Sequence, residues 1–218
     1  MVEAVFGLLS NSLALLADAG HNLSDVLGLL LAWGASVLAQ RLPTQRHTYG
    51  LRRTSVFAAL INALVLLVAV AAIAWEAIHR FGHSESVGSG TVIWVASVGI
   101  LVNGFTAWLF MPGKEHDVNI RGAYLHMAAD AAISLGVVLA AITMRFTGWL
   151  WVDPIVSLAI AVAIGVGTWS LLRESLNLAL DAVPAGIHPA DVEAYLASLP
   201  GVKAVHDLHI WAMSTTEV

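Results

Sequence analysis

The chain has 218 residues, of which 58% are hydrophobic and only 11% charged, and its formal net charge is −5. Soluble domains carry roughly 25% charged residues, and disordered chains are polar and charge-rich, so the composition excludes both classes. The ten basic residues are too few for nucleic-acid binding, and the absence of cysteine excludes disulfides and thiolate metal ligands. The chain is therefore expected to be an integral membrane protein embedded in a lipid bilayer.

The charge-free stretches set the number of predicted spans. The opening segment 2–9 is apolar apart from Glu3 but too short to cross a bilayer, and Ser10 and Ser12 indicate a turn after it. A helix needs about 20 residues to span the hydrocarbon core. Five stretches reach that length, although the first and fourth do so only if they include acidic residues: 13–40, 54–75, 87–113, 120–144 and 154–172. We expect five full spans preceded by the end of a sixth.

The distribution of Lys and Arg predicts the orientation. Eight of the ten basic residues fall on one side of the predicted membrane, with four arginines in the loop between the spans 13–40 and 54–75. The alternate loops hold only Arg80 and Arg145. Because cytoplasmic loops carry the excess of positive charge, the four-arginine loop and the C-terminal segment are expected on the cytoplasmic side.

The composition changes after Arg173, where prolines and charged residues become more frequent. Residues 189–198 have the periodicity of a helix that begins at a proline. Pro200 and Gly201 indicate a turn, and 202–213 is expected to be a strand. One helix and one strand do not make a core, so this part is interpreted as the beginning of a further domain.

Two of the predicted spans carry the same polar pair. His21 and Asp25 are four residues apart, as are His126 and Asp130, so each pair lies on one face of its helix. Two imidazoles and two carboxylates supply a complete tetrahedral set of ligands for zinc, and such a set also suits cobalt or cadmium to a degree. Histidine binds metal only in its neutral form, so protons compete with the ion. The pattern predicts a metal site coupled to protons.

Two simpler interpretations stay open at this point. A single His/Asp pair in a span is compatible with a hydrogen-bonded packing pair, although the repetition on two spans argues against it. A closed four-ligand site is also compatible with a structural metal, because nothing in the residues themselves requires a path for an ion. An intramembrane metalloprotease lacks support, since there is no His-Glu-x-x-His motif, and we expect no enzymatic activity.

Several other polar residues are secondary candidates. Asp18 is interpreted as a cap near the start of its helix, with support of the metal ligands as the alternative. Asn22 is expected to form an interhelical hydrogen bond. His206 and His209 are three apart on the expected strand and so face opposite sides, which argues against one metal bound by both through that strand.

The residues 7–25 resemble the signature of the first and second helices of the cation diffusion facilitator family. The resemblance continues through 46–50, 58–63, the His126–Asp130 pair, Asp153-Pro154 and 205–211, and so covers nearly the whole chain. It implies a homodimer that exports zinc or related divalent ions in exchange for protons through six helices, followed by a cytoplasmic ferredoxin-like domain. It also implies that His21, Asp25, His126 and Asp130 are the transport-site ligands. Histidine at the first of these positions is the variant usually associated with zinc preference over cadmium.

The predicted fold class is thus an all-α membrane protein: a six-helix transmembrane bundle with a truncated first helix, and the start of a cytoplasmic α+β domain of ferredoxin-like type. The family's first helix begins before Met1 and its last domain continues past Val218, so both ends are expected to be incomplete. We expect a transmembrane domain over 1–175, an incomplete C-terminal domain over 176–218, and spans near 1–10, 13–40, 54–78, 88–111, 118–145 and 150–173.

The predicted function is that of a secondary active transporter that exports Zn²⁺ from the cytoplasm, with Co²⁺ and Cd²⁺ as further candidates. The coupling ion is H⁺, the mechanism is alternating access, and the location is the cell membrane with a cytoplasmic C-terminus. The alternative is a membrane metal-binding protein without transport, a sensor or structural subunit. Some family members bind a further metal after the second helix, where this chain has His47 but Leu51 in place of a second histidine.

Overall fold

The computed structural model describes residues 2–81, 86–115 and 117–215, without the side chains of 118 and 119. Within these residues all regular structure is helical: α1 (Val2–Leu9), α2 (Leu13–Ala39), α3 (Thr54–Arg80), α4 (Ser89–Phe110), the 3₁₀ turn η1 (Met111–Gly113), α5 (Val118–Thr147), α6 (Val152–Ala179) and α7 (Pro189–Ser198).

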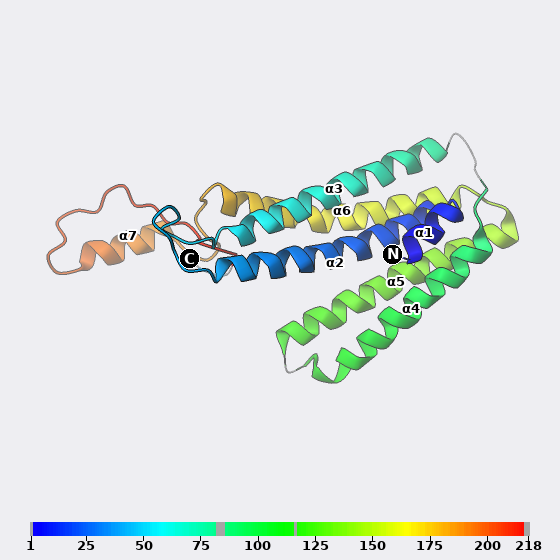
Figure 1. Ribbon diagram of the computed structural model, residues 1–218, viewed down its shortest axis with the longest axis horizontal. Coiled ribbons are helices and arrows are strands. Elements are labelled where there is room, and N and C mark those ends of the chain that lie inside the picture. The colour runs from blue at the N-terminus through cyan, green and yellow to red at the C-terminus, as the bar shows by residue number, and fades with distance from the viewer. Residues whose placement is uncertain (1, 82–85, 116, 216–218) are drawn as a thin grey trace. The chain divides into compact units, whose positions relative to one another are not determined.

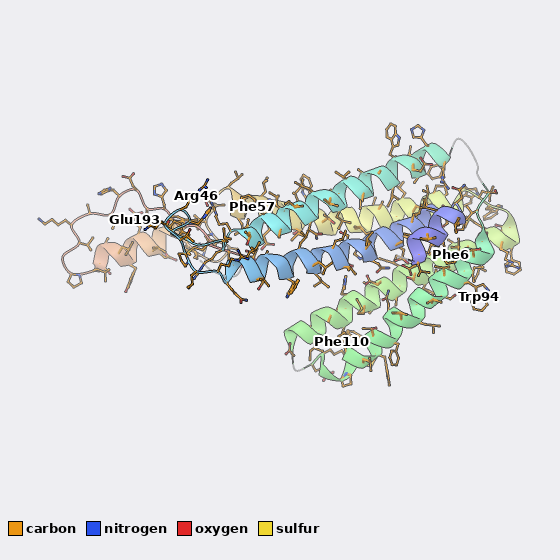
Figure 2. The ribbon with its side chains drawn as sticks, viewed as in Figure 1. Phe6, Arg46, Phe57, Trp94, Phe110 and Glu193 are labelled. Carbon is orange, nitrogen blue, oxygen red and sulfur yellow. The ribbon has the colours of Figure 1, made fainter. Side chains whose placement is uncertain are left out.

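Five helices, α2 to α6, are long and apolar enough to cross a membrane, which confirms the expected number of full-length spans. Their outward side chains are large and apolar. Trp94 is 77% exposed and Val68 71% exposed, and Figure 2 shows Trp94 pointing away from the neighbouring helices. In water such a surface would aggregate, whereas against lipid tails it carries no penalty. The exposed apolar surface therefore fits a bilayer environment.

The chain forms two compact units, of which the first contains the predicted metal ligands. It comprises residues 1–25 and 66–166: α1, the start of α2, the second part of α3, α4, α5 and the first part of α6. Within it α4 and α5 pack side by side (Figure 1). Its core is apolar and includes Leu15, Val92, Val137 and Ile160.

A short turn joins α1 to α2 and is held by several hydrogen bonds. The amide of Ser12 donates to the Gly7 carbonyl at 3.1 Å, and the amide of Gly88, just before α4, donates to the Ser10 carbonyl at 2.8 Å. Asn11 adopts a left-handed conformation, with φ 54°, which Asn tolerates better than most residues. The guanidinium of Arg80 donates to the Asn11 carbonyl at 2.7 Å and to its Oδ1 at 2.8 Å. The predicted turn is thus present and is fixed to the end of α3 and the start of α4.

The first turn of α2 is capped from another helix. Asp153, the second residue of α6, is fully buried, and its carboxylate accepts hydrogen bonds from Ser12 Oγ at 2.6 Å, the Leu13 amide at 2.8 Å and the Ala14 amide at 3.4 Å. A carboxylate at a helix N-terminus satisfies amides that have no partner within the helix and interacts favourably with the helix dipole. Asp153 therefore fixes where α2 begins and joins it to α6.

The second unit comprises residues 26–65 and 167–218. The Oγ1 of Thr54 donates to the Ala35 carbonyl at 3.2 Å, which links the start of α3 to α2. Arg53 forms an exposed ion pair with Asp181, beyond the end of α6. The amide of Thr215 donates to Ser55 Oγ at 3.3 Å and brings the C-terminal segment to α3.

Of the two elements expected in the C-terminal segment, the helix is present and the strand is not. The helix α7 begins at Pro189 and ends at Ser198, as the periodicity predicts. Residues 202–213, expected to be a strand, form no regular secondary structure. A strand is stabilised by hydrogen bonds to a neighbouring strand, and the described residues contain none. The division into domains at 175/176 stays a prediction.

Candidate metal site

The two His/Asp pairs lie on facing helices of the first unit. His21 and Asp25 are on α2, and His126 and Asp130 are on α5. Both pairs sit among small residues such as Gly20, Ala128 and Ala129, which allow two helix backbones to approach closely. The structure brings all four predicted ligands together: one ligand atom from each lies within 4.8 Å of the others.

The four side chains form a closed ring of His–Asp contacts, in which Asp130 takes part through both of its carboxylate oxygens. Across the helices, His21 Nε2 lies 3.3 Å from Asp130 Oδ1, and His126 Nε2 lies 3.3 Å from Asp25 Oδ2. Within each helix the corresponding His–Asp distance is 3.7 Å. The two imidazole rings meet edge to face, with centroids 5.9 Å apart, and both Nε2 atoms lie within 3.7 Å of Asp25 Oδ2.

The distances between the ligand atoms can be compared with those around a tetrahedrally coordinated metal ion. Zinc binds nitrogen and carboxylate oxygen at about 2.0–2.2 Å, and in a tetrahedron of that size neighbouring ligand atoms lie roughly 3.3–3.6 Å apart. The two separations of 3.3 Å between the helices already match such an edge, and the other pairs of ligand atoms, all within 4.8 Å of one another, would have to move closer around an ion. Asp130 Oδ1 is buried and has no hydrogen-bond partner, so its lone pairs remain for an ion.

The site is closed on one side and open on the other. The Asp130 side chain is 2% exposed and that of His21 17%, whereas Asp25 and His126 are 32% and 44% exposed. Asp25 and His126 are therefore the accessible members of the cluster, and His21 and Asp130 are its buried members.

Asp18 does not cap its helix. It is the sixth residue of α2, fully buried, and its Oδ2 accepts a hydrogen bond from Ser134 Oγ of α5 at 2.7 Å. The capping interpretation is wrong because Asp153 occupies the position at the start of α2 and satisfies its free amides. Asp18 instead joins α2 to α5 one turn from His21, which supports the alternative that it positions the ligand pairs.

A second polar contact joins α2 to α1. Asn22 Nδ2 donates to Glu3 Oε2 at 3.1 Å, which confirms the expected interhelical hydrogen bond. The neighbouring Gly99 of α4 leaves space for these groups, because a Cβ atom there would lie 2.7 Å from Glu3 Oε1 and 3.1 Å from Ser134 Oγ. Four helices thus contribute to the polar surroundings of the His/Asp cluster.

Replacing Ser134 by alanine is expected to lower the free energy of unfolding by about 1–3 kcal/mol, because Asp18 would lose its hydrogen-bond donor while remaining buried. Thermal unfolding in detergent measures the effect. The matched control is Thr143→Ala on the same helix, whose hydroxyl donates only to the Leu139 carbonyl of α5 at an exposed position. Equal unfolding temperatures for the two variants would contradict the assigned role of Ser134.

The other three histidines discussed above, His47, His206 and His209, do not belong to the His/Asp cluster. His47 is exposed in the loop between α2 and α3. His206 and His209 are exposed and both lie against Asp207, with Nδ1 3.2 Å from its Oδ2 and 2.7 Å from its carbonyl oxygen respectively. Among the described residues, His21, Asp25, His126 and Asp130 are the one group of three or more such side chains close enough to share an ion.

Comparison with known proteins decides the family. Residues 1–178 match the family model described as the cation efflux transmembrane domain. The chain belongs to the cation efflux family. This membership confirms the resemblance to cation diffusion facilitators that the sequence motifs indicate.

Three relatives illustrate the similarity to other cation efflux proteins. The chain is 36% identical over 217 residues to the cadmium, cobalt and zinc/H(+)-K(+) antiporter of Bacillus subtilis, covering 99% of this chain and 70% of the relative. It is 39% identical over 220 residues to the zinc transporter ZitB of Escherichia coli, covering 100% and 70%. It is 37% identical over 215 residues to the metal cation efflux system protein CzcD of Cupriavidus metallidurans, covering 99% and 68%. The cation efflux family consists of transporters and not enzymes, as predicted.

Proposed function

We propose that this chain exports Zn²⁺ from the cytoplasm in exchange for H⁺, and that His21, Asp25, His126 and Asp130 bind the ion during transport. The observation that supports this most strongly is the ring of four N–O separations of 3.3–3.7 Å across α2 and α5. A packing pair needs one His and one Asp in contact, whereas this ring places both histidines against both carboxylates.

The ligand set supports zinc as the substrate, with cobalt and cadmium as further candidates. Two imidazole nitrogens and two carboxylate oxygens in tetrahedral positions are typical of zinc, whereas magnesium and calcium prefer oxygen ligands alone at higher coordination numbers. The names of the relatives support the same substrates, since they include zinc, cadmium and cobalt.

Charge balance supports coupling to protons. Two carboxylates and a divalent cation add to zero, so a loaded site crosses the low-dielectric membrane without net charge. An empty site would keep two negative charges there, which is costly unless protons replace the ion. The histidines must also be neutral to bind metal. Metal and protons are thus expected to occupy the site alternately, which is the requirement for antiport.

Access to the His/Asp cluster would alternate between the two sides of the membrane if the surrounding helices moved while the four ligands kept their places. Asp25 and His126 are the exposed members of the cluster and receive the ion on the side that is open in this conformation. Movement of helices on either side of α2 and α5 would then close this entrance and open another. The four ligands come from only two helices, so the site can stay intact while the surrounding helices move.

The larger assembly is proposed from the family alone. It would be a homodimer with six helices per subunit, of which α2 to α6 are five, and a ferredoxin-like domain that includes α7. The excess of Lys and Arg on one side supports a cytoplasmic location for the α2–α3 loop and the C-terminus, in the cell membrane.

Reconstitution into sealed vesicles tests the function. With a pH-sensitive dye inside, addition of Zn²⁺ outside is expected to make the lumen more alkaline as protons leave and zinc enters, and an acid lumen should accelerate zinc uptake. Protein-free vesicles are the control. Zinc binding with neither uptake nor a change of lumenal pH would contradict the proposal and favour a sensor or structural protein.

A further inference from the structure

Among the described residues, three buried side-chain atoms in or beside the His/Asp cluster have no hydrogen-bond partner: Asp130 Oδ1, His21 Nδ1 and Asp18 Oδ1. Buried polar atoms are nearly always paired, because leaving one unpaired costs free energy. The proposed zinc site accounts for Asp130 Oδ1, which lies 3.3 Å from His21 Nε2. It does not account for the other two atoms, which belong to neighbouring side chains of α2.

Asp18 and His21 contact the same face of α5. They are three residues apart on α2 and so are neighbours on one side of that helix. His21 Nε2 lies 3.3 Å from Asp130 Oδ1, and Asp18 Oδ2 accepts a hydrogen bond from Ser134 Oγ at 2.7 Å. Asp130 and Ser134 are four residues apart on α5 and therefore also follow one another on one face. The two contacts are thus successive links between the same two helix faces, and in each side chain of α2 the second polar atom is left without a partner.

The two unpartnered atoms of α2 are chemically complementary. A neutral imidazole that binds metal through Nε2 carries its proton on Nδ1, which is then a hydrogen-bond donor. The carboxylate oxygen of Asp18 is an acceptor, and this carboxylate is fully buried and already held by Ser134. Histidines that bind metal almost always donate their second ring N–H to a carboxylate, a carbonyl or water, which fixes the orientation of the ring.

We propose that Asp18 is a positioning residue for His21, whose Nδ1–H donates a hydrogen bond to Asp18 Oδ1 when zinc is bound at Nε2. The inference rests on the proposed zinc site. The bond is absent from this structure, and it forms as the ligand atoms move closer around the ion. Both unpartnered atoms then gain a partner in one step, which favours the loaded site. No such acceptor precedes His126 on α5, where Ala123 stands at the corresponding position.

Zinc calorimetry and ¹⁵N-histidine NMR of the purified full chain in detergent test this role. Asp18→Leu removes the acceptor and should weaken zinc binding by about 10- to 100-fold, whereas Asp18→Asn keeps an acceptor oxygen and should recover most of that loss. In the zinc-loaded protein, the Nδ1–H proton of His21, identified by its loss in His21→Gln, should move upfield in Asp18→Leu while that of His126 stays in place. The matched control is Asp153→Asn, which alters another buried carboxylate bonded to a serine and should bind zinc within twofold of the unmodified chain.

The NMR signal separates positioning of His21 from a general loss of stability. If Asp18→Leu bound zinc as tightly as the unmodified chain, if its His21 proton signal stayed in place, or if Asp18→Asn bound as weakly as Asp18→Leu, the inference would be overturned while the zinc site stood. Absence of zinc binding by the unmodified chain would refute both together. Should Asp18→Leu not fold, Asp18→Asn still decides, because a neutral amide oxygen is a weaker acceptor than a carboxylate and must move the His21 proton signal upfield, leaving that of His126 unchanged.

Discussion

Alanine at position 25 or at position 130 is expected to abolish zinc transport and to lower zinc affinity by roughly 100-fold or more. Each substitution removes one of the four proposed ligands and one of the two negative charges that would balance the ion. Loss of a group that merely orients a metal ligand already costs about 10- to 100-fold in affinity, so loss of a ligand should cost at least as much.

Calorimetry of zinc binding in detergent and zinc uptake by vesicles measure the two effects separately. Asp25→Asn is the more conservative variant, because it keeps one oxygen ligand but loses the charge, and its affinity should fall between those of the alanine variant and the unmodified chain. The matched control is Glu193→Ala, which removes an exposed carboxylate from α7 (labelled in Figure 2). If Asp25→Ala and Asp130→Ala both retained full uptake, the four-ligand site would be refuted.

Replacing Asp153 by alanine is expected to cause the largest loss of stability, about 3 kcal/mol or more. The change leaves the buried Ser12 hydroxyl and the amides of Leu13 and Ala14 without their acceptor, and removes a negative charge from the start of α2. Asp153→Asn should lose less, because the side chain keeps its shape and one acceptor oxygen, although its NH₂ group faces donors.

Thermal unfolding in detergent measures this effect, and Asp191→Ala is the matched control. Asp191 also lies in the first turn of a helix, α7, but is exposed, so its loss should cost well under 1 kcal/mol. An unfolding temperature for Asp153→Ala equal to that of the control would disprove the cap. Zinc affinity of the folded Asp153→Asn protein should stay close to that of the unmodified chain, because Asp153 is not in the ligand ring.

The sequence was sufficient to predict features that depend only on nearby residues of the same helix. The spacing of four residues places His21 beside Asp25 and His126 beside Asp130 on any α-helix, and the length of the apolar stretches requires membrane-spanning helices. The proline that opens α7 is a local signal of the same kind. In each case the physical cause lies within a few residues, so no knowledge of the packing is needed.

Interactions between distant residues escaped prediction because they depend on which helices are neighbours. Asp18 and Asp153 are both acidic residues near the start of an apolar stretch, so either can be interpreted as a cap of its own helix. The structure shows Asp18 bonded to Ser134, 116 positions away, and Asp153 capping α2, 141 positions from Ser12. The signal available in the sequence for Asp153 was an acidic residue directly before Pro154, at the start of the last predicted span.

The expectation for 202–213 was wrong for a related reason. Alternation of side chains describes the faces that a strand would have, but its stability comes from pairing with another strand. The described residues contain no strand that could be that partner, so the pattern alone did not produce one.

The turn between α1 and α2 is expected to restrain how the helices of the first unit can move during transport. Only a few residues connect the two helices, and this connection is also bonded to the start of α4 through Gly88 and to the end of α3 through Arg80. Four helices therefore meet at this end of the first unit and are expected to act there as a common pivot. Large displacements should occur at their far ends, so that a small rotation about the turn is magnified with distance along each helix.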